Sequence, residues 1–295
     1  MIIDCSTDKQ TRIQSYIPYA VAPRPICFAS TINKAGQINL SPFSYFNVAS
    51  GTPPVLMFSV LRRVRDNTTK HTLENILEVP EVVINIVTYD MVQQTSLSSC
   101  EYPKDVNEFE KAGFTMQMAT KIRPPMVQES KIKMECKVID IKSFGEQGGA
   151  GQVIFAEILC MHINDDILDE QGMIDQTKLA LVARLGGDWY SAVRPNNLFQ
   201  VAKPNRSLGI GVDGLPLSIR NSSILTGNNL GQLANVEAVP NINPRFRNEK
   251  LQQIFQYYAT DPIEMEKEIQ WYAKELLDDN KIEEAWQVLL ANASV

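Results

Sequence analysis

Apolar residues in the first part of the chain come in short runs separated by turn-forming residues. Runs rich in β-branched and aromatic residues predict strands over residues 25–32, 38–50 and 55–61. Residues 33–37, which contain a glycine, have the length of a hairpin turn, and residues 51–54 end the second run with glycine and proline. This alternation favours an antiparallel sheet.

Helical and strand-like segments follow. Apolar residues at helical spacing predict a helix over residues 70–78, which Pro80 ends. A short apolar strand is predicted over residues 82–87, and then two short helices over residues 91–99 and 106–112.

The longest strand candidates are residues 131–144 and 152–163, joined by a glycine-rich hairpin tip over residues 145–151. Together with the earlier runs they give a mostly antiparallel sheet with peripheral helices. Such a sheet is best closed into a barrel, because closure removes exposed strand edges. We therefore predict a mainly β fold, a β-barrel with peripheral helices.

The character of the chain changes after Gly187. Residues 207–238 are rich in Gly, Asn, Ser and Leu, and residues 248–292 carry Trp and Leu at helical spacing. We predict a first domain over residues 1–190. An accessory, largely helical segment over residues 191–295 would pack on the barrel or on a partner subunit.

Composition and charge narrow the class of protein. Hydrophobic residues make up 44% and charged residues 21% of the chain, an ordinary globular balance. The net charge of −6 gives no general attraction to nucleic acid or to an anionic membrane, and no apolar run is long enough to span a bilayer. The acidic N-terminus lacks a secretory pattern, and five scattered cysteines favour a reducing compartment. We predict a cytoplasmic protein without nucleic-acid or membrane partners.

The cysteines and histidines give no indication of a metal centre. His71 and His162 are the only histidines, and no Cys-x-x-Cys pair or dense Cys/His cluster stands out. Cys27, Cys136 and Cys160 lie in apolar strand candidates, which predicts buried, inert thiols. We therefore predict no metal site.

Small polar side chains mark the first two predicted strands. Such a surface can approach a flat heteroaromatic ring, such as that of a flavin, and hydrogen-bond its edge. Hydroxyls on strands are also ordinary β-formers that bond neighbouring backbone, and the spacing alone favours this second interpretation. The candidate residues are Ser30, Thr31, Ser41, Ser44 and Asn47.

A basic loop and the predicted helix after it offer a candidate phosphate site. Backbone N–H groups at the helix start, the Lys70 ammonium and the Thr72 hydroxyl would suit a phosphate, and Arg62 and Arg65 would add charge. A capped surface helix beside a solvated loop is the commoner arrangement for this pattern. No acid or nucleophile is visibly paired with His71, so we predict no catalytic side chain.

Two glycine-rich segments imitate nucleotide-binding loops. Residues 209–214 fit the G-x-G-x-x-G spacing of a dinucleotide site, but Pro216 disfavours the helix that should follow. Residues 148–151 lack the Lys-Ser/Thr of a P-loop. We expect neither segment to bind a nucleotide.

Taken in order along the chain, these segments resemble the flavin reductase-like FMN-binding split-barrel proteins, the group that contains flavoredoxin. The resemblance spans roughly residues 15–190 and rests on an ordered series of segments. Lys70-His71-Thr72 and Asn75 are similar to the family's Lys-Asp-Thr…Asn-Ile element, with His71 in place of the aspartate. The other matching segments are residues 24–31, 39–47, 53–59, 108–113, 129–130, 135–136 and 184–190.

The resemblance implies a split barrel that forms a homodimer and binds FMN near the subunit interface. The flavin would carry the redox chemistry, and the side chains would bind and orient it. The resemblance assigns Ser30, Thr31, Ser41, Ser44 and Asn47 to the ring, Lys70, His71, Thr72 and Asn75 to the phosphate end, and Arg184 to the cofactor or the interface.

We therefore expect an FMN-dependent oxidoreductase that passes electrons from NAD(P)H or a protein donor through bound FMN. One alternative is an FMN electron carrier that docks on a redox partner protein and has no substrate of its own. The other is a barrel without cofactor that serves as a binding module. Anaerobic mixing with NAD(P)H tests the first alternative, and FMN uptake tests the second.

Overall fold

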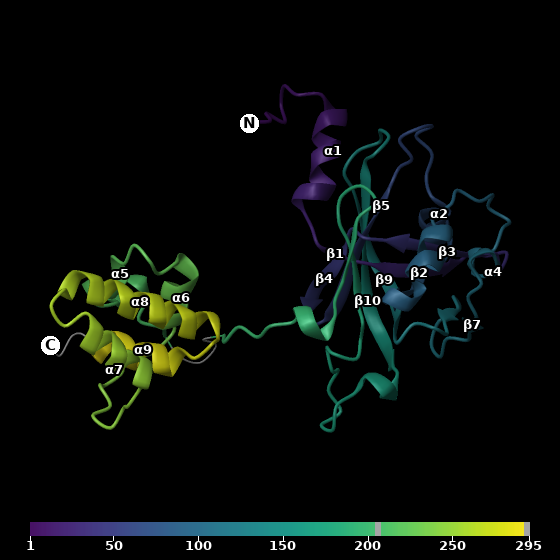
Figure 1. The fold of residues 1–295 in the computed structure, drawn as a ribbon. Helices are drawn as coiled ribbons and strands as arrows, with labels where there is room; N and C mark the ends of the chain where they lie inside the picture. Colours follow the sequence, from purple (N-terminus) through teal and green to yellow (C-terminus); the bar gives the residue numbers. More distant parts are fainter. Residues whose placement is uncertain (204–207, 292–295) are drawn as a thin grey trace. The chain divides into compact units, whose positions relative to one another are not determined.

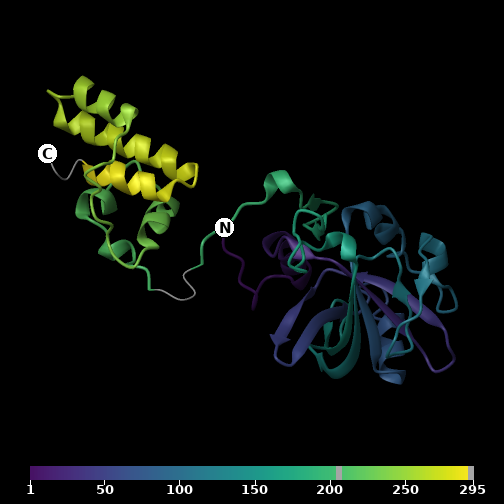
Figure 2. The same ribbon diagram turned by 90° about the horizontal axis from the view of Figure 1, so that it is seen from below.

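The computed structural model describes residues 1–203 and 208–291. Contacts divide the chain into two compact units, Met1–Phe199 and Gln200–Val295 (Figure 1, Figure 2). The sequence-based boundary was placed after residue 190. Among the described residues, no helix combines the length and the hydropathy that a bilayer span requires.

The body of the first unit is an antiparallel sheet of seven strands. They are β2 (Cys27–Ile32), β3 (Ile38–Phe43), β4 (Phe46–Gly51), β5 (Pro54–Leu61), β6 (Glu81–Ile86), β9 (Ile132–Ser143) and β10 (Gly151–Ile163). Their order is β3-β2-β6-β9-β10-β5-β4, so that β3 and β4 are the two edge strands (Figure 1). The prediction of a mainly β barrel with peripheral helices is confirmed.

The corner between β3 and β4 takes the chain from one edge of the sheet to the other. The sequence predicted one continuous run over residues 38–50, and this was wrong, because Ser44 and Tyr45 break the strand. β3 pairs with β2 while β4 pairs with β5, and one straight strand cannot serve both edges. Ser59 donates its backbone N–H to the Tyr45 carbonyl at 2.8 Å, which attaches the corner to β5.

Alternate side chains of the strands form an apolar core. Phe58 is fully buried there, and helix α2 (His71–Glu78) adds Leu73 and Ile76 from its apolar face. The helix predicted over residues 70–78 therefore forms where its apolar face has a core to cover.

A second apolar cluster joins the sheet to short helices. Phe28 of β2 packs there with Phe109 of α4 (Glu108–Ala112). Helix α4 ends at Gly113, whose φ of 69° suits a residue without a Cβ atom. Helix α3 (Val92–Leu97) precedes α4 and contacts it.

Very short strands complete the first unit. β1 (Arg24–Pro25), β11 (Val182–Arg184) and β12 (Tyr190–Ala192) form a separate antiparallel sheet with β11 in the middle, and β7 (Met116–Gln117) pairs with β8 (Met126–Val127). Strands of two or three residues carry no readable period, so the sequence did not predict them.

Helix α1 (Gln10–Ala20) was also missed. It has no buried residue and contains Pro18, so neither an apolar stripe nor helix propensity reveals it. The Arg24 guanidinium donates to the Pro18 carbonyl at 2.6 Å and to the Leu185 carbonyl at 3.0 Å. These bonds tie the end of α1 to the turn after β11.

The regular elements that the structure describes in the second unit are all helices. Its helices are α5 (Leu217–Arg220), α6 (Gly227–Ala234), α7 (Glu249–Tyr257), α8 (Pro262–Asp278) and α9 (Ile282–Ala291). They share one apolar core, in which Trp286 and Leu277 are buried. The helical tail predicted over residues 248–292 is confirmed as far as Ala291, and Asn292 lies outside the described residues. Trp271, one of the tryptophans at helical spacing in this tail, is 51% exposed, whereas Trp286 is buried.

The glycine-rich residues 209–214 do not form a strand-to-helix phosphate loop. Val212–Gly214 is a single 3₁₀ turn, and Pro216 is the N-cap of the four-residue helix α5. A dinucleotide site of this type needs a strand before the glycines and a full helix after them.

Candidate functional site

Three adjoining cavities form a groove beside helix α3. Ser99, just beyond the end of α3, lines all three. The largest cavity has a volume of about 630 Å³, the middle one about 180 Å³ and the smallest about 70 Å³. These three cavities together are the α3 groove.

Aromatic and cationic side chains line the largest cavity. Tyr190, Tyr89, Val92 and Val182 lie on its walls. The Arg184 guanidinium lies over the Tyr190 ring, 4.5 Å from the ring centroid. Because Arg184 of β11 is paired directly with Tyr190 of β12, the two side chains stand on the same face of their small sheet. A cavity of this volume with apolar walls and a few polar groups is typical of small-molecule sites.

The end of β3 and helix α3 enclose the middle cavity. Pro42, Phe43 and Ser44 line it from the strand side, and Thr95 and Ser96 line it from the helix. Small hydroxyl side chains on both sides leave room for a flat ring and offer hydrogen bonds to its edge.

The smallest cavity is polar and lies at the start of α2. Lys70 is half-buried, with Nζ 5.4 Å from the centroid of the Phe43 ring. Among the described residues, no carboxylate lies within ion-pair distance of Lys70 Nζ, whereas Arg63 is paired with Glu101 at 3.5 Å. Helix α2 begins without a side-chain cap, which leaves first-turn N–H groups free to bind an anion. The polar lining comprises Asn39, Ser41, Arg63, Lys70, His71, Ser99, Glu101, Tyr102 and Glu108.

Burial changes the pKa values of Lys70 and His71, two titratable side chains that line this cavity. Burial lowers the pKa of the Lys70 ammonium, the nearby charge of Arg63 lowers it further, and the more distant carboxylate of Glu101 opposes the shift. Burial also lowers the pKa of His71 below its ordinary value of 6.5; Glu74 opposes this effect, and Arg63 and Lys104 add to it. His71 is therefore neutral at pH 7. A bound anion would oppose both of these downward pKa shifts.

Several predicted residues are buried in β2 or at the start of α2. Thr72 Oγ1 donates to Asn39 Oδ1 at 2.7 Å, and Asn75 Nδ2 donates to Thr31 Oγ1 at 3.2 Å. Ser30, Thr31 and Thr72 are 0% exposed. A threonine hydroxyl has one proton, so Thr72 cannot donate to Asn39 and to a phosphate oxygen at the same time.

The α3 groove brings together some of the residues predicted for the site. Asn47 lies elsewhere, exposed on edge strand β4, where its Oδ1 accepts the Val48 N–H at 2.8 Å. Of the predicted set, Ser41, Ser44, Lys70, His71 and Arg184 line the groove, and Ser30, Thr31, Asn47, Thr72 and Asn75 do not.

Arg63 lines the polar cavity, whereas Arg62 and Arg65, which were expected to add charge to the phosphate site, do not. Arg62 Nε donates to Asn67 Oδ1 at 2.8 Å, and Arg65 is paired with Glu101 at 2.8 Å. Neither lines the groove, whereas Arg63 does. Alternate residues of an extended segment point in opposite directions, which separates Arg63 from Arg62.

Helix α3 and strand β12 supply groove residues that the sequence analysis missed. Ser96 and Ser99 come from the end of α3, and Tyr190 comes from β12. The signal was present as hydroxyl residues three apart at the end of the helix predicted over residues 91–99, which places them on one face.

The order of side chains along the α3 groove suits a phosphate at one end and a flavin ring at the other. The polar cavity offers to a phosphate the start of α2 and Lys70, for which the described part of the chain holds no carboxylate partner. The middle cavity offers hydroxyls, and the largest offers aromatic walls with Arg184. A flavin ring needs apolar contact on its faces and polar groups at its edge.

Comparison with known proteins gives a family match. A family model described as a flavin reductase like domain matches residues 20–180. An uncharacterised protein from Aquifex aeolicus is 41% identical over 170 residues, which are 58% of this chain and 84% of that relative. An uncharacterised protein from Halalkalibacterium halodurans is 36% identical over 173 residues, which are 58% of this chain and 82% of that relative.

Solved structures share the fold of the first unit. Nitrilotriacetate monooxygenase component B from Bacillus cereus has a TM-score of 0.63 at 25% identity, over 68% of this chain and 98% of that chain. The 2-nitrobenzoate 2-nitroreductase NbaA of Pseudomonas fluorescens has a TM-score of 0.62 at 25% identity, over 72% of this chain and 100% of that chain. Flavoredoxin of Desulfovibrio vulgaris matches in fold, with a TM-score of 0.52 at 18% identity over 63% of this chain and 93% of that chain.

The family match covers the seven-stranded sheet and ends before β11, so the helical second unit lies beyond it. The resemblance read from the ordered segments is confirmed. The chain belongs to the flavin reductase-like domain family and has that family's split-barrel fold.

Proposed function

We propose that this chain is an FMN-dependent oxidoreductase that takes electrons from NAD(P)H or a protein donor and passes them on through FMN held in the α3 groove. The observation that carries the proposal is the half-buried Lys70 ammonium, which has no carboxylate partner among the described residues. A partly buried charge without a partner is costly, and a phosphate ligand offsets that cost with a charge-assisted hydrogen bond.

In this proposal the phosphate binds between Lys70, Arg63 and the first N–H groups of α2. The ring lies along residues 42–44, at the end of β3 and the corner that follows it, and faces the hydroxyls of α3. Arg184 stands at the ring end of the groove, where its charge favours the reduced, anionic flavin. Bound FMN supplies the redox chemistry, and the chain binds it, orients it and limits the access of water.

The names of two similar structures support an oxidoreductase role. One is called a nitroreductase and the other is component B of a monooxygenase. The alignments cover 100% and 98% of those two chains.

We also propose a homodimer with FMN near the interface. Edge strand β4 leaves its free side open to a partner, and Val48 on it is 64% exposed. Asn47 is exposed on the same strand, so it would be available to the cofactor site of a second copy. Sedimentation velocity should then give the mass of two chains, and a monomer at micromolar concentration would contradict this assembly.

Anaerobic mixing of the FMN-loaded chain with NADH and, separately, with NADPH tests the proposed reaction. A reductase should bleach the flavin absorption band within seconds with at least one nucleotide, while free FMN under the same conditions bleaches far more slowly. Bleaching by dithionite but by neither nucleotide would favour the electron carrier that receives electrons from a protein. Failure to take up FMN would contradict the proposal.

A further inference from the structure

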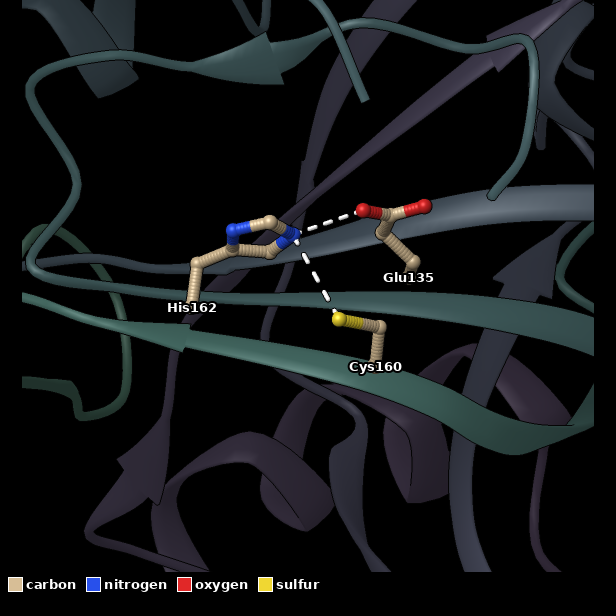
Figure 3. Close-up of side chains that lie close together, drawn as sticks. All are labelled: Glu135, Cys160 and His162. Carbon is tan, nitrogen blue, oxygen red and sulfur yellow. Dashed lines mark hydrogen bonds and ion pairs between the residues drawn. The ribbon is translucent and has the colours of Figure 1, made fainter. Parts of the chain in front are cut away.

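Three side chains with metal-binding atoms meet at one point outside the α3 groove. Glu135 comes from β9, and Cys160 and His162 come from β10 (Figure 3). His162 Nε2 is 2.6 Å from Glu135 Oε1 and 3.7 Å from Cys160 Sγ. The three atoms all lie within 4.8 Å of one another. None of these residues lines the groove described above.

A β-bulge sets this arrangement. Ile158 pairs with Cys136, but the next pair along the ladder is Cys160 with Glu135, because the extra residue Leu159 interrupts the register. Regular pairing would have placed Leu159 opposite Glu135 and turned Cys160 to the other face of the sheet. His162 follows Cys160 by two residues and therefore points to the same face.

The carboxylate of Glu135 is held in a fixed orientation. Its side chain is 0% exposed. Oε2 accepts the backbone N–H groups of Lys121 at 2.6 Å and Ile122 at 3.2 Å, and Oε1 accepts that of Thr120 at 2.8 Å. Hydrogen bonds of this kind orient a ligand oxygen and keep it in place.

The geometry does not suit a Cys–His–Glu catalytic triad. In such a triad the histidine meets the nucleophile with one ring nitrogen and the carboxylate with the other. Here the same nitrogen, Nε2, faces both Glu135 and Cys160 (Figure 3). One nitrogen cannot donate to the carboxylate and accept the thiol proton at once. Three donor atoms that converge on one point are instead the pattern of a metal site.

We propose that Glu135, Cys160 and His162 bind one zinc ion through Oε1, Sγ and Nε2. Sulfur, nitrogen and carboxylate oxygen are the ligand types that zinc takes in proteins. Cys160 is half-buried and the His162 side chain is 26% exposed, so an ion and a fourth ligand, water, reach the site from solvent. On binding, the zinc replaces the Cys160 thiol proton, which leaves to solvent, and the two anionic ligands balance the charge of the ion.

The spacing around His162 Nε2 needs little adjustment. At bond lengths of about 2.0–2.3 Å, tetrahedral zinc separates its nitrogen and sulfur ligands by about 3.6 Å and its nitrogen and oxygen ligands by about 3.3 Å. The distance of 3.7 Å between Nε2 and Sγ already fits, and the 2.6 Å contact between Nε2 and Oε1 has to open by roughly 0.7 Å. His162 lies towards the surface, so its ring has room to make this movement.

Zinc content after gel filtration tests the proposal. The full-length chain is stripped with a chelator, freed of the chelator, incubated with zinc chloride and passed through the column. Wild type should retain one zinc ion per chain, while Cys160→Ser and His162→Gln should weaken zinc binding by at least about tenfold. Cys100→Ser, which removes an exposed thiol elsewhere, is the matched control and should bind as wild type does.

Cobalt(II) in place of zinc gives a second readout. A cobalt–thiolate bond produces a charge-transfer band, seen as a difference spectrum, in wild type and Cys100→Ser but not in Cys160→Ser. Circular dichroism checks that each variant is folded. A wild-type zinc content no higher than that of Cys160→Ser would overturn the proposal. The proposal would also fail if Cys100→Ser lost as much zinc as Cys160→Ser does.

Discussion

Thr72 Oγ1 donates a hydrogen bond of 2.7 Å to Asn39 Oδ1, and the Asn39 amide donates in turn to Glu108 Oε1 at 2.8 Å. Glu108 Oε2 also accepts the Leu40 N–H at 3.0 Å, so its carboxylate caps edge strand β3. These groups are buried. The start of α2, the edge of the sheet and helix α4 are therefore joined by one chain of hydrogen bonds, and Asn39 and Glu108 in this chain also line the polar cavity.

Thr72→Val should lower the stability of the first unit more than its affinity for FMN. The variant keeps the shape of the side chain but leaves Asn39 Oδ1 without its donor, which costs about 1–3 kcal/mol. Urea denaturation and FMN titration of the same samples measure the two effects. Thr72→Ser, which keeps the hydroxyl, should lie close to wild type. A loss of FMN affinity with unchanged stability would show that the hydroxyl binds the phosphate.

Lys70→Met should weaken FMN binding by roughly 10-fold to 100-fold, the cost of one charge-assisted hydrogen bond. Riboflavin, which lacks the phosphate, should bind both proteins alike. Lys104→Met is the matched control, because Lys104 is already paired with Glu74 at 3.0 Å and is 42% exposed. Equal losses of affinity for FMN and for riboflavin would show that Lys70 does not bind the phosphate.

FMN affinity should rise as the pH falls from 8 towards 6.5. The pKa of His71 lies below 6.5 in the free chain because of burial, so His71 is neutral over this range. A neighbouring phosphate raises that pKa, and the complex then takes up a proton that the free chain does not hold. Measurements stay above the second phosphate pKa of about 6. In His71→Gln, FMN affinity should depend less on pH. The same pH dependence as in wild type would show that another group takes up the proton.

Arg184→Gln should lower the reduction potential of bound FMN. In the proposed binding mode the guanidinium, which lies over the Tyr190 ring, stands at the ring end of the groove, where its charge would stabilise the anionic reduced flavin. If the reduced flavin loses about 1 kcal/mol of stabilisation, the reduction potential of a two-electron couple falls by roughly 20 mV. Redox titration against a reference dye measures the shift. Arg65→Gln removes a charge that is 75% exposed and should leave the potential unchanged.

Segments with a long period or a strong turn signal could be predicted from the sequence. β9, β10 and the glycine-rich tip between them occur where residues 131–163 indicated, since strand length and the turn are local properties. The corner at Ser44 and Tyr45 could not be predicted, because it follows from which strands pair at the two sheet edges.

The candidate site, too, could be predicted from the sequence only in part. Lys70 and His71 line the groove as the motif suggested, whereas Thr72 and Asn75, from the same short helix, turn towards β3 and β2. A helix turns by about 100° per residue, so neighbours in a motif face different surroundings. The cluster at Glu135 depends on a bulge that shifts the register of β10, so the sequence analysis, which predicted no metal site, did not find it.

Ser99→Trp tests most directly whether the α3 groove holds FMN. Ser99 is exposed and lines all three cavities, so a bulky indole there fills the groove without entering the core. Ser143→Trp, at an exposed position on β9, is the control. FMN titration followed by flavin fluorescence should show one FMN per chain for wild type and Ser143→Trp, and none for a folded Ser99→Trp. Wild-type affinity in Ser99→Trp would contradict the account.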